Sequence, residues 1–296
     1  MPYVALVLTA PLLTGAHISA VQAVSPLLND KPPVNLSPAA ACEWVLDISP
    51  HQAGDLLDTA RAALGDTPVD VNIVNNDENR RKQLLIADMD STIIEQECID
   101  EIADFAGCGA EVSAITERAM RGELDFEEAL TVRVGLLKGL DTATLQRVVT
   151  ERLTITSGAQ TLVATMVSNG AFCALVSGGF TFFTSRIAQR VGFHENRANT
   201  LEVDEDKLTG RPVPPILGRQ AKLDALQEFS KSRNIPLDAT LAVGDGANDL
   251  AMIKAAGLGV AYHAKPVVAA EAKAAINHSD LTALLYLQGY HRTDFV

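Results

Sequence analysis

Short apolar runs that alternate with helical segments are the feature of this sequence that most limits its fold. Residues 84–87 are continuously apolar, and similar runs recur at 171–176, 240–243 and, more weakly, 257–261. Such runs are typical of strands buried on both faces of a parallel sheet. Stretches with helical periodicity separate them, for example 159–167 and 220–230. The pattern predicts an α/β domain with a doubly wound parallel sheet over residues 83–296.

No comparable strand is found between the first two runs. Residues 97–154 have helical character throughout. This predicts a helical cap inserted after the first strand of the sheet.

A second, smaller region precedes the sheet. Residues 4–8, 41–48 and 69–74 have strand character, and residues 17–25 and 49–64 have helical character. Ser49 followed by Pro50 is a favoured helix start. The order strand–helix–strand–helix–strand predicts a small α+β domain over residues 1–76, with a polar linker after it.

The overall charge limits the classes of partner. The formal net charge is -13 and hydrophobic residues make up 47% of the chain. An acidic surface repels nucleic acid and anionic lipid, so we expect neither as a partner. The four cysteines show no zinc-binding spacing, and no run of eighteen apolar residues is present. These features predict a cytoplasmic location.

Polar residues follow the apolar runs at the point where each predicted strand ends. The carboxyl ends of parallel strands meet at one edge of the sheet, where ligands bind. This places three segments together with a lysine from the preceding helix, namely 88–92 (DMDST), 177–179 (SGG), 244–249 (GDGAND) and Lys222.

The aspartates at this edge require a cation. Two carboxylates ~4 Å apart repel by ~4 kcal/mol at an effective dielectric of ~20. The set is Asp88, Asp90, Asp245 and Asp249, with no thiol or imidazole nearby in sequence, which favours Mg²⁺ as cofactor. Lys222 supplies a further positive charge.

The two aspartates of residues 88–92 suit different chemical roles. Asp88, directly after the strand, can attack a phosphorus atom as a nucleophile. Asp90 can protonate the leaving oxygen and later activate water. The Ser177 hydroxyl and the amides of Gly178 and Gly179 offer donors to a phosphoryl oxygen.

The four motifs, in this order, resemble those of the haloacid dehalogenase (HAD) superfamily over residues 83–291. The resemblance implies a Rossmann-like core, Mg²⁺ and an aspartyl-phosphate formed on Asp88. It implies metal ligation by Asp88, the backbone carbonyl of Asp90, and Asp245. It also implies that Ser177 and Lys222 bind phosphate. Asn248 and Asp249 would orient Lys222 and the metal's waters, and Asn248 is grouped with the substrate-binding residues.

Residues 88–92 followed by 95–101 (EQECIDE) resemble the phosphoserine phosphatases within that superfamily. The resemblance implies that Glu97 contacts the substrate ammonium, that Arg133 contacts its carboxylate and that Phe126 lines the pocket. A zwitterionic substrate needs one anion and one cation, so the pair is physically reasonable. The activity expected is hydrolysis of phosphoserine, the last step of serine biosynthesis.

The first 74 residues are similar in element order to the ACT-like, ferredoxin-type regulatory domains that precede such phosphatases. A glycine-rich serine-binding turn is not evident, so dimerisation is as well supported as regulation, and a homodimer is expected.

Three alternative functions fit part of this pattern. A response-regulator receiver also uses Asp, Lys and Mg²⁺, but is far shorter and has no use for Asp90 or a cap. A non-catalytic sensor is expected to lack the nucleophile. A HAD enzyme that acts on another small phosphate, or that transfers phosphate from phosphoserine to homoserine, stays open.

Overall fold

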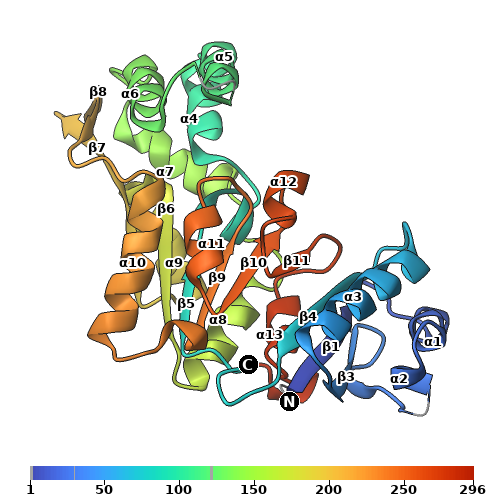
Figure 1. Ribbon diagram of the computed structural model, residues 1–296. Helices are drawn as coiled ribbons and strands as arrows, with labels where there is room; N and C mark the ends of the chain where they lie inside the picture. The colour runs from blue at the N-terminus through green and yellow to red at the C-terminus, as the bar shows by residue number, and fades with distance from the viewer. Residues whose placement is uncertain (1–2, 30, 121–122) are drawn as a thin grey trace.

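The computed structural model describes residues 3–29, 31–120 and 123–296, which form two sheets with their helices (Figure 1). The larger sheet has seven strands in the order β11-β10-β9-β5-β6-β7-β8. All neighbours are parallel except β7 and β8, which are antiparallel. The strands are β5 (Leu84–Ala87), β6 (Phe172–Phe180), β7 (Glu195–Asp204), β8 (Lys207–Val213), β9 (Thr240–Gly244), β10 (Leu258–Tyr262) and β11 (Ala274–Ile276).

Helices cover both faces of this sheet, and this is why its central strands are apolar throughout. Leu85 and Ala87 pack in one cluster with α8 (Ala159–Ser168), α9 (Thr181–Val191) and α13 (Ala283–Leu287). Leu84 and Ile86 pack in another with α10 (Arg219–Ser232), α11 (Leu250–Ala255) and α12 (Pro266–Ala269). The predicted Rossmann-like HAD core is confirmed.

Three strands of the large sheet were not predicted, namely β7, β8 and β11. β7 and β8 form a partly exposed hairpin at the edge of the sheet, in which Glu205 and Asp206 make the turn at positive φ. β11 has only three residues. None of them presents the continuous apolar run that identified the central strands.

Between residues 96 and 154 the described residues form the helices called here the helical insertion. They are α4 (Cys98–Ala106), α5 (Gly109–Met120), α6 (Phe126–Leu136) and α7 (Thr142–Glu151). In Figure 1 they lie beyond the carboxyl ends of the central strands. The prediction of helix without strand between residues 97 and 154 agrees with these elements.

Two short segments connect the insertion to the core, residues 93–96 and 154–156, called here the hinge segments. An isolated bridge joins Ile94 to Ile155. The Glu95 amide donates to the Thr154 carbonyl over 3.1 Å, and the Gln96 side chain accepts from the Thr154 amide over 2.8 Å. The outgoing and returning chains are therefore bonded to each other.

The smaller sheet has the order β2-β3-β1-β4 and is antiparallel throughout. With its helices it forms the N-terminal unit: β1 (Tyr3–Thr9), α1 (Gly15–Ala23), α2 (Pro26–Asn29), β2 (Val34–Ser37), β3 (Ala41–Asp47), α3 (Pro50–Leu64) and β4 (Asp70–Asn75). The predicted order was one strand short, because β2 has four residues and directly follows two prolines. Apart from the single-turn α2, the complete order is that of the expected ferredoxin-type fold.

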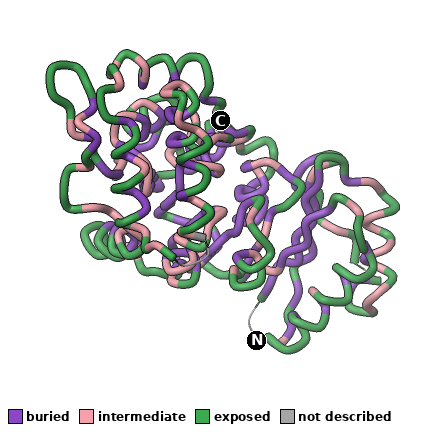
Figure 2. Tube along the Cα trace, turned by 90° about the horizontal axis from the view of Figure 1, so that it is seen from above, coloured by how far each residue is buried: buried purple, intermediate pink, exposed green. Residues whose placement is uncertain are grey.

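Both faces of the small sheet are covered. Leu6 and Leu8 of β1 pack with buried residues of the unit's own helices, whereas Ala5 and Val7 belong to the same cluster as α13 of the large unit. Figure 2 shows buried segments through the centre of both units.

Polar side chains join β4 to the edge strand β11. The Asn72 side-chain nitrogen donates to the Ala275 carbonyl over 3.0 Å, and the Asn72 side-chain oxygen accepts from the Ala275 backbone amide over 2.9 Å. The side chain thus bonds to β11 as a neighbouring strand would. The buried Asp70 carboxylate accepts hydrogen bonds of 2.7–3.2 Å from the backbone amides of residues 277–279. The N-terminal unit thus supplies partners to an edge of the large sheet that otherwise lacks them.

Among the described residues, no helix is both long enough and apolar enough to cross a membrane.

Candidate active site

Residues 88–92 form a tight turn at the carboxyl end of β5. The Asp88 side chain caps it by accepting from the Met89 amide over 2.7 Å. Ser91 adopts the left-handed conformation with φ 53°, which is rare for a residue with a side chain. A non-glycine residue in this region indicates that surrounding contacts hold the turn in one shape.

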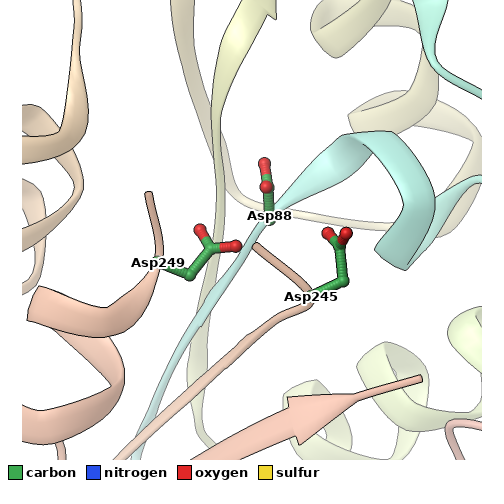
Figure 3. A group of neighbouring side chains, drawn as sticks. All are labelled: Asp88, Asp245 and Asp249. Atoms are coloured by element: carbon green, nitrogen blue, oxygen red, sulfur yellow. The ribbon is translucent and has the colours of Figure 1, made fainter. Parts of the chain in front are cut away.

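Three carboxylates meet beside this turn and are called here the aspartate triad: Asp88, Asp245 and Asp249. One oxygen of each lies within 4.8 Å of the others. Figure 3 shows Asp249 and Asp245 on opposite sides of Asp88. Lys222 Nζ lies 2.6 Å from Asp88 Oδ2 and 2.6 Å from Asp249 Oδ1. The predicted meeting of Asp88, Asp245, Asp249 and Lys222 is what the structure shows.

The charge balance of the triad calls for more positive charge than Lys222 provides. Burial, followed by the Asp88 carboxylate, raises the pKa of Asp249 to about 7 and that of Asp245 to about 6. Burial lowers the pKa of Lys222, but Asp88 and Asp249 more than offset this, so the pKa is raised and the amine is charged. An all-oxygen set with surplus negative charge fits a hard divalent cation such as Mg²⁺.

Glycine is required close to the triad. A Cβ on Gly244, the last residue of β9, would lie 2.3 Å from Cγ of Asp249. The absence of a side chain there lets Asp249 reach Lys222.

Asp90 has surroundings different from those of Asp88. Its Oδ1 accepts from the Cys98 amide over 2.9 Å and its Oδ2 accepts from the Ser177 hydroxyl over 3.1 Å. Desolvation, followed by the Asp88 charge, raises the pKa of Asp90. The Asp90 carboxylate lies outside the triad. The metal ligand predicted at this residue is its backbone carbonyl, and that stays a prediction.

Ser177, Gly178 and Gly179 lie at the end of β6, just before α9. The Gly179 amide donates to Ser177 Oγ over 2.8 Å. A Cβ on Gly179 would lie 2.7 Å from Asp90 Oδ2, and one on Gly178 would lie 3.1 Å from the Phe126 ring. These glycines let the turn approach both the acid Asp90 and the helical insertion.

Glu97 directly precedes α4 and is hydrogen-bonded to the turn at 88–92. The Ser91 hydroxyl donates to Glu97 Oε1 over 2.7 Å. Partial desolvation, followed by the Asp90 charge, raises the pKa of Glu97 to about 8, although by surface area the residue is still exposed. The structure therefore places Glu97 beside the aspartates.

Arg133 lies on α6 of the helical insertion. Its Nε donates to the Ala129 carbonyl over 3.2 Å and its Nη1 to the Thr116 hydroxyl over 3.4 Å. Burial lowers its pKa, while Asp100 and Glu97 act in the opposite direction. The charges of Arg133 and Glu97 are thus close enough to interact, although no described hydrogen bond joins them.

A cavity of about 490 Å³ opens between the start of α6 and the loop before α10. Phe126 and Gly218 both line it. Phe126 therefore contacts both this cavity and the turn at Gly178, and its role in lining a substrate pocket stays a prediction.

Asn199 is a buried site residue that the sequence did not reveal. Its side chain donates to the carbonyls of Gly178 and Leu217 and accepts from the Leu217 amide over 2.6 Å. It fixes the turn at 177–179 against the loop that leads to Lys222. It lies in β7, which was not predicted, and nothing in the local sequence marks it. Asn248, by contrast, was predicted and lies in the loop after β9 with its Oδ1 beside Gly246.

Comparison with known proteins identifies the family of this chain. The model of the haloacid dehalogenase-like hydrolases matches residues 85–254, which is more than half of the chain. This chain belongs to the haloacid dehalogenase-like hydrolase family.

Within this family, the chain is similar to several proteins named as phosphoserine phosphatases. A phosphoserine phosphatase of Streptomyces coelicolor is 43% identical over 259 residues, which cover 87% of this chain and 62% of that protein. One from Polaromonas sp. is 48% identical over 73% of this chain and 94% of its own length. The unliganded crystal structure of a "probable phosphoserine phosphatase" from Vibrio cholerae superposes with a TM-score of 0.80 at 34% identity, over 96% of this chain and 86% of that one. The chain spans less than two thirds of the length of several curated relatives that it matches.

Proposed function

We propose that this chain is a magnesium-dependent phosphoserine phosphatase that works through an aspartyl-phosphate on Asp88. The observation that carries the proposal is that the two aspartates of one turn have different surroundings. Asp88 lies against Lys222, whereas Asp90 accepts hydrogen bonds from the Cys98 amide and the Ser177 hydroxyl and has a raised pKa. One suits a charged nucleophile and the other a protonated acid.

The first step joins an Asp88 oxygen to phosphorus and breaks the bond from phosphorus to the seryl oxygen. The seryl oxygen takes the proton of Asp90 and leaves as serine. In the second step Asp90, now a carboxylate, accepts a proton from water as the water oxygen bonds to phosphorus. The bond from phosphorus to Asp88 then breaks, and phosphate is released.

The phosphoryl group would be held by the Lys222 amine, the Ser177 hydroxyl and the amide of Gly178. Asp249 orients Lys222 through its 2.6 Å contact, and we group Asn248 with these phosphate-binding residues. Asp88, Asp245 and the backbone carbonyl of Asp90 would hold Mg²⁺, which would supply positive charge to the phosphoryl oxygens.

The substrate assignment rests on Glu97 and Arg133. Glu97 supplies a carboxyl group beside the aspartates, which a bound ammonium group would hold in its charged form, and Arg133 supplies a cation from the helical insertion. Together they suit the ammonium and carboxylate of an amino acid whose phosphate faces Asp88. The names of the relatives support this choice of substrate.

The division of the chain is part of the proposal. Residues 1–76 would form the regulatory or dimerisation domain, and residues 83–296 the phosphatase core with a cap at about 97–154. The covered faces of the small sheet favour contacts of a homodimer through the helices of the N-terminal unit or through β2, rather than through a sheet face.

A phosphate-release screen tests the function. The substrates are phosphoserine, phosphothreonine, phosphoglycolate and a sugar phosphate, each with Mg²⁺ and with EDTA. We expect phosphoserine to have the highest kcat/KM and EDTA to abolish turnover. A higher kcat/KM for another phosphate would contradict the substrate assignment. A rise in serine formation when homoserine is added would instead indicate phosphotransfer.

A further inference from the structure

Asn199, which lies in β7 opposite the end of β6, joins two backbone segments of the active site. Its side chain is buried, with 1% exposed. Its Nδ2 donates to the Gly178 carbonyl over 2.8 Å and to the Leu217 carbonyl over 3.2 Å, and its Oδ1 accepts from the Leu217 amide over 2.6 Å. Both the donor and the acceptor of this buried side chain are therefore used to hold one segment against the other.

The strand pairing around Asn199 is irregular. β6 and β7 pair in register up to Val176, the register then shifts, and pairing resumes where Phe180 lies opposite Asn199. Such irregularities bend a strand away from its neighbour and are common beside active sites. Residues 177–179 fall in this irregular stretch, and the Asn199 side chain bonds to the middle one.

The two segments carry groups that are proposed to bind phosphate. The first contains Ser177, whose hydroxyl donates to the Asp90 carboxylate over 3.1 Å. The second leads into α10, on which Lys222 Nζ lies 2.6 Å from Asp88. A phosphoryl group bound to both the Ser177 hydroxyl and the Lys222 amine requires these segments to keep one separation.

The same two segments contact Phe126 of the helical insertion. A Cβ on Gly178 would lie 3.1 Å from the Phe126 ring, and a Cβ on Gly218, the residue after Leu217, would lie 3.5 Å from that ring. The ring therefore packs against both segments. A change in their separation would alter this contact together with the phosphate-binding groups.

We propose that Asn199 is a positioning residue of the active site, which sets the separation between the turn at 177–179 and the start of α10 and thereby the affinity for a phosphoryl group. The inference rests on the proposed function in that it takes this site to bind phosphate. Among the described residues, the Asn199 side chain bonds only to backbone groups, so it acts through the two segments.

Isothermal titration of the full chain with inorganic phosphate, in the presence of Mg²⁺, tests the proposal without turnover. Asn199→Leu keeps a similar side-chain size but removes all three hydrogen bonds. It should raise the Kd for phosphate about tenfold, as the weakening of a hydrogen bond to a charged group would. Asn196→Leu is the matched control, because Asn196 also lies on β7 but accepts from the Thr184 hydroxyl of α9 instead. It should leave the Kd unchanged.

Turnover gives a second readout. Asn199→Leu should lower kcat/KM about 100-fold, because a displacement of about 1 Å in an active site can cost that much. The loss should be equal for phosphoserine and phosphoethanolamine, since both carry the phosphoryl group. A loss of Arg133 should instead affect phosphoserine far more.

Thermal unfolding shows whether each variant is folded at the assay temperature. If Asn199→Leu does not fold, Asn199→Ser replaces it with the same expected losses. Its shorter side chain leaves room for water but cannot join both segments.

The proposal is overturned if a folded Asn199 variant binds phosphate with the wild-type Kd, whatever its turnover. It is also overturned if Asn196→Leu weakens phosphate binding equally, or if the wild-type chain binds no phosphate at about 20 mM. The phosphate-release screen decides phosphoserine hydrolysis separately. A different preferred substrate would leave the titration as a valid test of Asn199.

Discussion

Asp88 and Asp90 are separated by one residue, yet their carboxylates contact different groups. The extended backbone at Asp90 and the left-handed Ser91 turn the chain so that one carboxylate meets Lys222 and the other meets Ser177. The same turn presents Ser91 to Glu97. A few backbone angles therefore set the positions of the proposed nucleophile, the proposed acid and the carboxyl group proposed to bind the substrate.

Asp88→Asn is expected to abolish turnover of phosphoserine, by at least roughly 10⁴-fold in kcat, because the amide cannot attack phosphorus. The variant should stay folded, since it removes one of three mutually repelling carboxylates and leaves Lys222 paired with Asp249. Phosphate release and thermal unfolding check both statements. Substantial remaining turnover would refute the role of Asp88.

Arg133→Ala is expected to lower kcat/KM for phosphoserine about 100-fold, as loss of a charged contact to the substrate carboxylate would. Phosphoethanolamine, which lacks that carboxylate, should be affected far less. Arg118→Ala is the matched control, because Arg118 is a half-exposed arginine of the same insertion, paired with Glu123. Equal losses on both substrates would remove the case for Arg133.

Much of the site at this scale could be predicted from the sequence, for a topological reason. Asp88, Asp245 and Lys222 follow or precede buried parallel strands, and such strand ends meet at one edge whatever the loops do. Asn199 and the contact between Ser91 and Glu97 could not be predicted, because they depend on loop geometry and on a strand with no clear pattern.

At the scale of elements, buried strands had the clearest sequence patterns. The central strand β5 is buried on both faces and was predicted, whereas the short or exposed β2, β8 and β11 were missed. The contacts of those missed strands matter for the arrangement. The helical insertion bonds to β8 through Gly139 and Leu140, and β11 contacts β4.

The link from β4 to β11 yields a prediction at the scale of elements. Asp70→Ala should lower the free energy of unfolding by about 2 kcal/mol or more, because three backbone amides lose their buried acceptor. Urea unfolding measures the change. Asp66→Ala, at an exposed turn position, is the control. Equal stability of the two variants would show that Asp70 does not hold the joint.

At the scale of the whole molecule, the crowded carboxyl groups couple stability to pH. The pKa of Glu97 is raised to about 8 in the folded chain from an ordinary value of 4.5, so the folded form holds this proton more tightly than the unfolded form. The contribution of Glu97 to stability is therefore lost as pH rises from about 4.5 to about 8.

Thermal unfolding in EDTA between pH 5 and pH 8.5 tests this coupling. The Tm of the wild-type chain should fall over this range, and Glu97→Gln, which cannot ionise, should show a smaller fall. Glu78→Gln, at an exposed position, should follow the wild type. Identical slopes for Glu97→Gln and the wild type would contradict the assignment of the raised pKa.

The pairing of Asn72 with Ala275 has a consequence for the chain's behaviour in concentrated solution. An uncovered sheet edge is a template on which other molecules add strands and aggregate. The N-terminal unit occupies that position on β11 and so blocks the addition of further strands at this edge. Removing residues 1–76 would therefore be expected to cost solubility before it cost chemistry, since the triad and Lys222 lie entirely in the remaining part of the chain.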